Sequence, residues 1–154
     1  MSGRMTAIGL LGIAVIAGAW LWYAQTFTEY SRFEGPVEGF GAILKLEGDP
    51  GRPIMLSSIN GIRGSSSPLK FRACFQADIR SLDHVDDDVT YHDPIPLTAP
   101  SWFDCFDARE IGGDLETGHA QAFLVESEVA EGVDLVAALY PDGRGYAWRQ
   151  FRTR

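Results

Sequence analysis

The sequence predicts an α+β protein: an N-terminal transmembrane helix followed by a small antiparallel-sheet domain with one or two short helices. Three observations support this. Residues 5–28 contain no charge, and the stretch 7–24 is almost purely apolar. The rest of the chain consists of short apolar segments, which Gly, Pro, Asn and Asp residues separate. Short strands bounded by turn residues, with few helical stretches between them, favour an antiparallel sheet.

The apolar stretch has the length and the flanks of a membrane span. Eighteen helical residues rise about 27 Å, close to the thickness of a bilayer's hydrocarbon core. Trp20, Trp22 and Tyr23 gather at its end, where aromatic rings favour the membrane–water interface. A cleaved signal peptide is the alternative, because Ala17-Gly18-Ala19 fits a cleavage site. The apolar run continues beyond that site, which favours a retained anchor.

The charges around the span predict its orientation. Arg4 and the α-amino group precede the span, whereas Glu29, Arg32, Glu34 and Glu38 follow it. Positive charge stays in the cytoplasm, so we expect the domain on the periplasmic face of a bacterial inner membrane. The predicted organisation is a cytoplasmic tail at 1–5, a transmembrane helix at 6–25, a polar neck at 26–38 and a periplasmic α+β domain at 39–154.

Small residues on the span form a candidate helix-packing surface. Gly9, Gly12, Ala14 and Gly18 would let another transmembrane helix approach closely. The favoured interpretation, however, is that Gly and Ala are simply common in membrane spans. In either case we expect the chain to lie in a membrane.

The domain is acidic. The formal charge of the whole chain is −8, and from residue 5 onward it is −9, because the +1 of Arg4 is removed (−8 − 1). Such a domain repels nucleic acid and anionic lipid, so no nucleic-acid partner is expected. A basic periplasmic protein is a physically suitable partner. Solubility alone also explains the acidity.

Both cysteines, Cys74 and Cys105, follow the span. In an oxidising compartment an isolated pair predicts one structural disulfide, with two buried free thiols as the alternative. The sequence contains neither C-x-x-C nor C-x-x-C-H, so neither a thioredoxin-like site nor a c-type haem site is supported.

The alternation of apolar residues and the turn signals predict the elements of the domain. The predicted strands are 39–46, 52–57, 69–76, 120–125, 133–140 and 145–152. Loops are expected at Asn60-Gly61 and at 64–68, and an extended stretch at 93–101, which holds three prolines. One short helix is expected over 78–84. Another begins after Asp107, with Glu110 in its first turn, and ends at Gly118.

The densest polar cluster spans residues 83–93. Its members are Asp83, His84, Asp86, Asp87, Asp88, His92 and Asp93. Carboxylates and imidazoles bind divalent metals, but the spacing fits no EF-hand, so a solvated acidic loop is the favoured interpretation. Asp86, Asp87 and Asp88 are therefore candidates for docking a basic partner rather than metal ligands.

No reactive group stands out. Cys105 and His119 are a conceivable nucleophilic pair, but carboxylates flank Cys105 and raise the pKa of a thiol. Methionines and histidines are too scattered for a copper site, and no phosphate loop is present. We therefore assign no catalytic, cofactor-binding or metal-ligating residue, and no cofactor.

Arginines and aromatic residues supply the types that dominate protein interfaces. They are Arg63, Arg72, Arg144, Arg149, Trp102, Tyr146 and Trp148. Trp148 is an interface candidate on the last strand. The alternative, that the aromatic residues complete the core, is somewhat favoured.

Three strings occur together: SSSPLKFRACF at 65–75, LTAPSWFDCFD at 97–107 and DGRGYAW at 142–148. With the N-terminal span, they resemble an uncharacterised family of small single-span membrane proteins from alphaproteobacteria of the Rhodobacter group. The resemblance covers nearly the whole chain and includes both cysteines. It implies no activity and no catalytic residue.

The leading hypothesis is a non-enzymatic accessory or assembly subunit of an inner-membrane complex, for example a respiratory complex of the cytochrome oxidase type. Its partner would then be an integral membrane protein complex. An anchored ligand-binding or sensor domain is the second hypothesis, and an envelope enzyme is the third.

Overall fold

The computed structural model describes residues 3–48, 53–78, 80 and 90–153. The chain forms two compact units, Met1–Tyr30 and Ser31–Arg154. In the first unit, helix α1 (Gly3–Tyr23) continues into a π-helical turn, η1 (Ala24–Thr28). The hydroxyl of Thr28 donates a hydrogen bond of 2.6 Å to the carbonyl oxygen of Ala24 and closes that turn.

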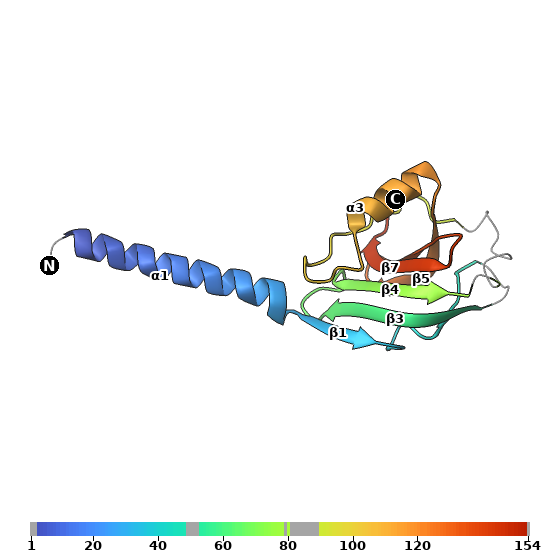
Figure 1. Cartoon of the computed structure of the whole chain (residues 1–154), viewed down its shortest axis with the longest axis horizontal. Helices are drawn as coiled ribbons and strands as arrows, with labels where there is room; N and C mark the ends of the chain where they lie inside the picture. The colour runs from blue at the N-terminus through green and yellow to red at the C-terminus, as the bar shows by residue number, and fades with distance from the viewer. Residues whose placement is uncertain (1–2, 49–52, 79, 81–89, 154) are drawn as a thin grey trace. The chain divides into compact units, whose positions relative to one another are not determined.

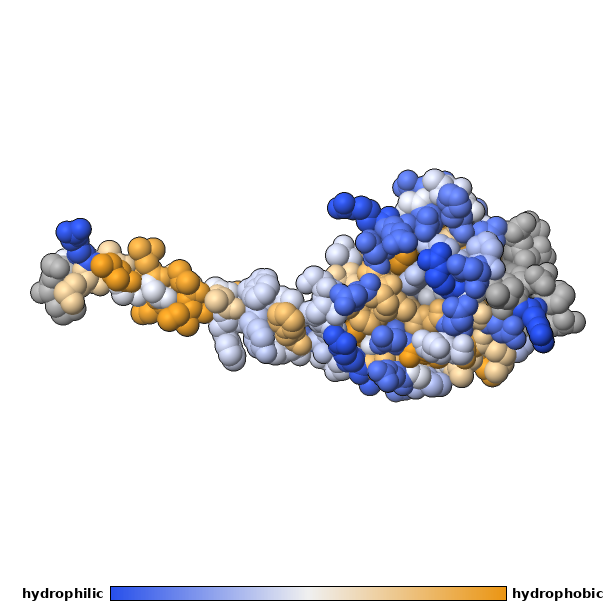
Figure 2. Space-filling model, viewed as in Figure 1, coloured by the Kyte–Doolittle hydropathy of each residue, from blue (hydrophilic) through white to orange (hydrophobic). Residues whose placement is uncertain are grey.

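Helix α1 has no buried residue. Its large apolar side chains are mostly exposed; for example, Ile16 is 71% exposed. Figure 2 shows hydrophobic residues over the N-terminal part of α1, giving way to paler residues toward its C-terminal end. By length and composition, Gly3–Thr28 is apolar enough to cross a membrane, a test that a signal sequence also passes. The predicted span, 6–25, lies within this helix.

The described part of the second unit is a seven-stranded sheet with one helix (Figure 1). The strands are β1 (Tyr30–Glu34), β2 (Ile43–Leu44), β3 (Ile54–Gly64), β4 (Phe71–Ala77), β5 (Gln121–Ala130), β6 (Val133–Leu139) and β7 (Arg144–Phe151). The helix is α3 (Ala108–Thr117). The strand order is β1-β3-β4-β7-β6-β5, and β2 also pairs with β3.

Two sequence-local antiparallel units meet at the centre of the sheet. β3 and β4 are one pair, and β5, β6 and β7 follow one another as a meander. Strands β4 and β7 join the two units, with Arg72 opposite Trp148 and Ala73 opposite Ala147. The predicted α+β class, with an apolar helix ahead of an antiparallel-sheet domain, is confirmed.

One face of the sheet carries the larger apolar core. Phe71, Ala73, Phe75 and Ala77 of β4 point to this face, because side chains alternate along a strand. Residues from the segment ahead of β3 cover them, and the ring of Phe40 lies 5.6 Å from the rings of both Phe71 and Phe75. This core therefore joins β4 to a segment that contributes little regular structure.

The opposite face lies under α3 and the segment that leads to it. Trp148 of β7 is fully buried here, and the ring of Phe106 packs edge-on against it at 6.4 Å. Phe103, in the segment that leads to α3, and Ile111 of α3 are buried as well. Both faces of the central strands are thus covered, which explains why all seven residues of β6 are buried.

Helix α3 begins and ends as predicted. The Asp107 carboxylate accepts hydrogen bonds from the backbone N–H groups of Arg109 and Glu110, which satisfies two donors of the first turn. Gly118 ends the helix in the left-handed conformation, with φ at 76°, and its N–H bonds back to the last turn.

Three predictions about the first third of the domain are wrong. The predicted neck, 26–38, contains β1, because the ring of Phe33 packs into the sheet over Gly61. The predicted strand 39–46 is reduced to Ile43–Leu44. Asn60-Gly61 lies inside β3 rather than in a loop. The pairing of β3 with β4 shifts between Ser57 and Asn60, where Ser58 has φ at 51°, and the strand continues beyond this irregularity.

The other strands appear close to their predicted positions. The structure places β4, β6 and β7 within two residues of the predicted bounds at each end, and residues 93–101 form no helix or strand. β5 extends five residues beyond its predicted end at 125. The predicted helix at 78–84 lies almost entirely outside the described residues.

Candidate functional site

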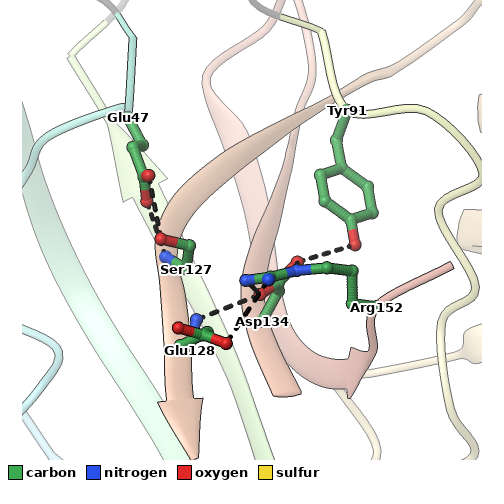
Figure 3. Close-up of polar contacts among 6 residues, drawn as sticks. All are labelled: Glu47, Tyr91, Ser127, Glu128, Asp134 and Arg152. Atoms are coloured by element: carbon green, nitrogen blue, oxygen red, sulfur yellow. Dashed lines mark hydrogen bonds and ion pairs between the residues drawn. The ribbon is translucent and has the colours of Figure 1, made fainter. Parts of the chain in front are cut away.

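The most connected polar cluster surrounds Asp134 on β6 (Figure 3). Its carboxylate accepts two hydrogen bonds from Arg152, of 2.8 Å from Nη2 and 3.2 Å from Nε. It also accepts one from the Tyr91 hydroxyl at 3.1 Å and one from the Glu128 backbone N–H at 3.0 Å. Asp134 is 2% exposed, so these four donors replace water around a buried carboxylate.

The surroundings set the charge states of this cluster. Burial raises the pKa of Asp134, but hydrogen bonds from Arg152, from the Glu128 backbone and from Tyr91 outweigh burial and hold the pKa below its ordinary value. Burial and the neighbouring Asp134 carboxylate raise the pKa of Tyr91 to about 12. At neutral pH the cluster therefore contains an ionised carboxylate, a guanidinium and a protonated phenol.

A bulged part of β5 lies beside this cluster. The pairing of β5 with β6 shifts twice, between Leu124 and Glu126 and between Glu126 and Ala130, and Glu128 has φ at 53°. The Glu47 carboxylate accepts bonds from the backbone N–H and the hydroxyl of Ser127, at 2.6 and 2.8 Å. Figure 3 shows Glu47 and Asp134 holding consecutive residues of this segment, Ser127 and Glu128.

The contacts of the cluster connect separate segments of the chain and have a structural role. The Ser127 hydroxyl and backbone N–H both donate hydrogen bonds to the Glu47 carboxylate, so this carboxylate fixes the position of Ser127 in the bulge. The raised pKa of Tyr91 makes its phenol a poorer acid and keeps it as a hydrogen-bond donor. The cluster joins the bulge of β5, the segment at Tyr91 and the chain after β7. We conclude that it stabilises the fold.

A second fixed region surrounds the disulfide between Cys74 on β4 and Cys105, 31 residues later. The buried Arg72 side chain donates from Nε to the Leu97 carbonyl oxygen at 2.7 Å and from Nη2 to that of Thr98 at 3.3 Å. The disulfide and Arg72 together hold the 97–105 segment against β4. The structure thus contains the predicted disulfide, and Cys105 is no free nucleophile.

A groove of about 820 Å³ lies between α3 and residues 93–96. On the helix, Ala108, Gly112 and Leu115 form one row, and Arg109, Gly113 and Glu116 form the next. Thr153 also lines it. We call this the α3 groove.

The wall of the α3 groove opposite the helix is fixed by Gln150. Its side-chain oxygen accepts bonds from the Ile95 backbone N–H at 2.7 Å and from Trp148 Nε1 at 2.9 Å. Its amide nitrogen donates to the Asp93 carbonyl oxygen at 3.1 Å. A fully buried glutamine thus holds a segment that has no regular secondary structure of its own.

The other predicted site residues lie on helix α1 or outside the described part of the chain. Gly9, Gly12 and Gly18 face open space, and Ala14 is exposed with them on α1. Asp86, Asp87 and Asp88, together with Asp83 and His84, lie outside the described residues. Among the described residues no three His, Cys, Asp or Glu side chains gather as metal ligands.

Trp148 is wrong as an interface candidate, because it is 0% exposed and belongs to the core. Its indole nitrogen is satisfied inside the protein by Gln150. Arg72 is buried as well, and Arg144 forms a surface ion pair with Asp142 at 2.8 Å. Of the predicted arginines, Arg63 remains exposed, and Arg149 is half-buried with its guanidinium 4.9 Å above the ring of Phe71.

Two features of the sequence could have indicated the α3 groove. Gly112 and Gly113 are adjacent in the middle of a predicted helix, where glycine is unfavourable. The proline-bounded Ile95 is the corresponding signal on the other wall. Nothing in the sequence indicated that these two segments lie side by side.

Residues 42–153 match the model of a family of unknown function, DUF6446. The chain belongs to this family. The DUF6446 match runs from just before β2 to the residue after Arg152, so it includes the disulfide, the Asp134 cluster and the α3 groove. It does not include α1 or β1. No curated protein and no solved structure matches the chain.

Proposed function

We propose that the protein is a membrane-anchored accessory or assembly subunit of a bacterial inner-membrane complex. The observation that carries this proposal is the first unit of the chain. Helix α1 has no buried residue and exposes apolar side chains along its whole length. Such a helix needs lipid or another apolar helix around it, and a retained span offers a lateral surface to a membrane partner.

The topology in this proposal follows from the charges at the ends of the helix. Arg4 precedes the apolar stretch, and Trp20, Trp22 and Tyr23 lie near its other end. The positive-inside rule then puts the N-terminus in the cytoplasm and the domain in the periplasm. An oxidising periplasm also accounts for the Cys74–Cys105 disulfide. An alphaproteobacterial respiratory complex of the cytochrome oxidase type is the host that we propose.

An anchored ligand-binding or sensor domain is the second candidate. The observation that favours it is the α3 groove, whose volume of about 820 Å³ is within the range of small-molecule sites. The two candidates differ in their partners. A sensor binds a small molecule without a stoichiometric membrane partner, whereas an accessory subunit purifies with one.

Purification of the full chain in a mild detergent tests the proposal. We expect an integral membrane complex to purify with the chain in a fixed ratio by mass spectrometry. The intact mass of the purified chain should include residues 3–28. A chain that has lost those residues, or that purifies without a membrane partner, would overturn the proposal.

Variants of α1 test whether the span contributes to the contact. The four small residues do not form one surface: at 100° per residue, Gly9 and Gly12 share one face of the helix, and Ala14 and Gly18 lie on roughly the opposite face. We expect leucines at one of these pairs to release the complex, because they prevent close helix packing, while leucines at the other pair leave it bound. If both double variants retain the complex, the span is only a tether.

A further inference from the structure

We propose that the α3 groove binds a basic polypeptide segment of the partner protein. This inference rests on the proposed function, because it assumes that the chain has a protein partner. It adds a second contact surface, located on the domain, and states the chemistry of what occupies it. Neither the span nor the DUF6446 match assigns a role to this groove.

The α3 groove is preformed. Its helix wall is fixed by the Asp107 cap, by the buried Ile111 and by a 2.8 Å hydrogen bond from the Tyr140 hydroxyl to Asp114. Its other wall, residues 93–96, is held by the two hydrogen bonds that Gln150 makes with Asp93 and Ile95. A groove with rigid walls binds a segment at a lower entropic cost than a surface that must first become ordered.

Neither glycine in the helix wall is required by the packing or by the backbone conformation around it. A Cβ atom on Gly112 or Gly113 would have no other atom within 4 Å, and neither residue has the positive φ that requires glycine. Glycine is a poor helix former, so both positions favour another residue as far as the fold is concerned. Their effect is to expose the backbone of α3 to a close approach from outside.

The opposite wall offers acceptors and an apolar contact. Pro94 and Pro96 have no N–H group, and the N–H of Ile95 is bonded to Gln150. Within the described residues no hydrogen bond reaches the carbonyl oxygens of residues 94–96. The side chain of Ile95 is 51% exposed at this wall. A bound segment must therefore supply hydrogen-bond donors and an apolar surface for Ile95.

The charged residues that line the groove favour a bound segment with a positive charge. Asp93 and Glu116 line it together with one cation, Arg109, which gives a lining charge of −1 (−2 + 1). All three residues are exposed. Lysine and arginine side chains donate hydrogen bonds to carbonyl oxygens, which the 94–96 wall requires, and they carry the charge opposite to that of the lining. The occupant that fits is thus a lysine- or arginine-bearing segment rather than a neutral ligand.

Site-specific photocrosslinking of the full chain in its native membrane tests this inference. The probe is benzoylphenylalanine in place of Ile95, which lies in the groove wall. The same probe at the exposed Asn60 of β3 is the matched control. The crosslinked peptide is identified by mass spectrometry, with and without Gly113→Leu, which fills the groove without changing its charge.

The inference predicts a crosslink from position 95 to a peptide with an excess of lysine and arginine. Gly113→Leu should reduce that crosslink at least tenfold and leave the crosslinks from position 60 unchanged. Gly113→Ala should raise the melting temperature of the chain, which would show that the glycine is dispensable for folding.

Two results would overturn it: a crosslinked peptide without excess basic residues, or a crosslink that persists in Gly113→Leu. Co-purification separates this failure from failure of the proposed function. If the membrane complex still purifies with the chain but position 95 gives no basic crosslink, the groove assignment is wrong and the accessory role stands. If no membrane complex purifies, the accessory role itself fails.

Discussion

The ring of Phe33 on β1 lies where a Cβ atom on Gly61 of β3 would be. From this position the ring stacks on Phe71, with ring centres 5.8 Å apart and planes at 24°. A residue at the outer edge of the sheet thus reaches across the neighbouring strand and joins the core. Only glycine at position 61 leaves space for this contact.

We predict that Gly61→Ala displaces the ring and destabilises the domain by about 1–3 kcal/mol, as overpacking does elsewhere. Denaturant unfolding of the full chain in detergent, followed by circular dichroism in the β-sheet region, measures this. In the Phe33→Ala background the penalty should disappear, because no ring then occupies the position. Gly112→Ala is the matched control and should stabilise the chain slightly. An equal cost with and without Phe33 would refute the packing explanation.

The Asp134 cluster predicts a specific pH dependence. Because the folded pKa of Asp134 is depressed, its ionised form contributes stability above the unfolded pKa of about 3.9, and this is lost as pH falls through the lower folded pKa. Asp134→Asn should cost about 2–3 kcal/mol at neutral pH, since it weakens the hydrogen bonds that replace water around a buried, ionised carboxylate. The difference from the unsubstituted chain should narrow below about pH 4.

Asp142→Asn is the control for this experiment. Asp142 also has a lowered pKa, because of hydrogen bonds from the Arg144 backbone and side chain, but its side chain is 56% exposed. An exposed pair of this kind contributes less than about 1 kcal/mol. A difference between Asp134→Asn and the unsubstituted chain that stays constant with pH would contradict the assigned ionisation.

Removal of the disulfide should destabilise the domain without preventing the other contacts of β4. Replacing both Cys74 and Cys105 by serine releases a constraint between residues 31 apart, which costs about 3–4 kcal/mol by chain entropy. Denaturant unfolding with and without a reducing agent measures the effect. The double variant should show no response to the reducing agent, and a response there would mean that the reagent acts elsewhere.

Gln150→Leu tests how the wall of the α3 groove is held. The variant removes the acceptor for the Ile95 N–H and for Trp148 Nε1, and the donor to Asp93. Leaving buried groups unpaired should cost about 3 kcal/mol in total. Hydrogen exchange should quicken at the Ile95 amide. Gln76→Leu is the control, because its bond to the Asp142 carbonyl oxygen is exposed and its loss should be nearly neutral.

The elements that sequence reasoning found are those with local causes. β6 and β7 were predicted because two apolar segments flank a Pro-Asp-Gly turn, and α3 because Asp107 and Gly118 mark its ends. β1 was missed because its place in the sheet depends on Phe33 meeting Gly61, a contact between distant positions. The length of β3 was missed because Asn60-Gly61, a pair that usually forms a turn, follows an irregularity inside the strand and continues it.

The candidate sites show the same division. The disulfide was predicted from the isolated pair of cysteines and the compartment expected for them, and the structure contains it. The Asp134 cluster draws on positions 91, 128 and 152, and no spacing in the sequence brings these together. The α3 groove depends on Gln150 pinning a proline-containing segment beside a helix. Such relationships arise only once the sheet has assembled.

β5 is the last strand of the sheet, and its outer edge is largely occupied. The Tyr91 N–H bonds to the Ala122 carbonyl oxygen at 2.7 Å, and the Glu47 N–H bonds to that of Leu124 at 2.8 Å. Beyond them the strand is bulged, and the Ser127 N–H bonds to the Glu47 carboxylate. An open strand edge would invite a second copy of the chain to pair with it edge to edge. The groups of β5 that are already bonded to Tyr91 and Glu47 cannot pair with a second copy, so this edge resists edge-to-edge aggregation.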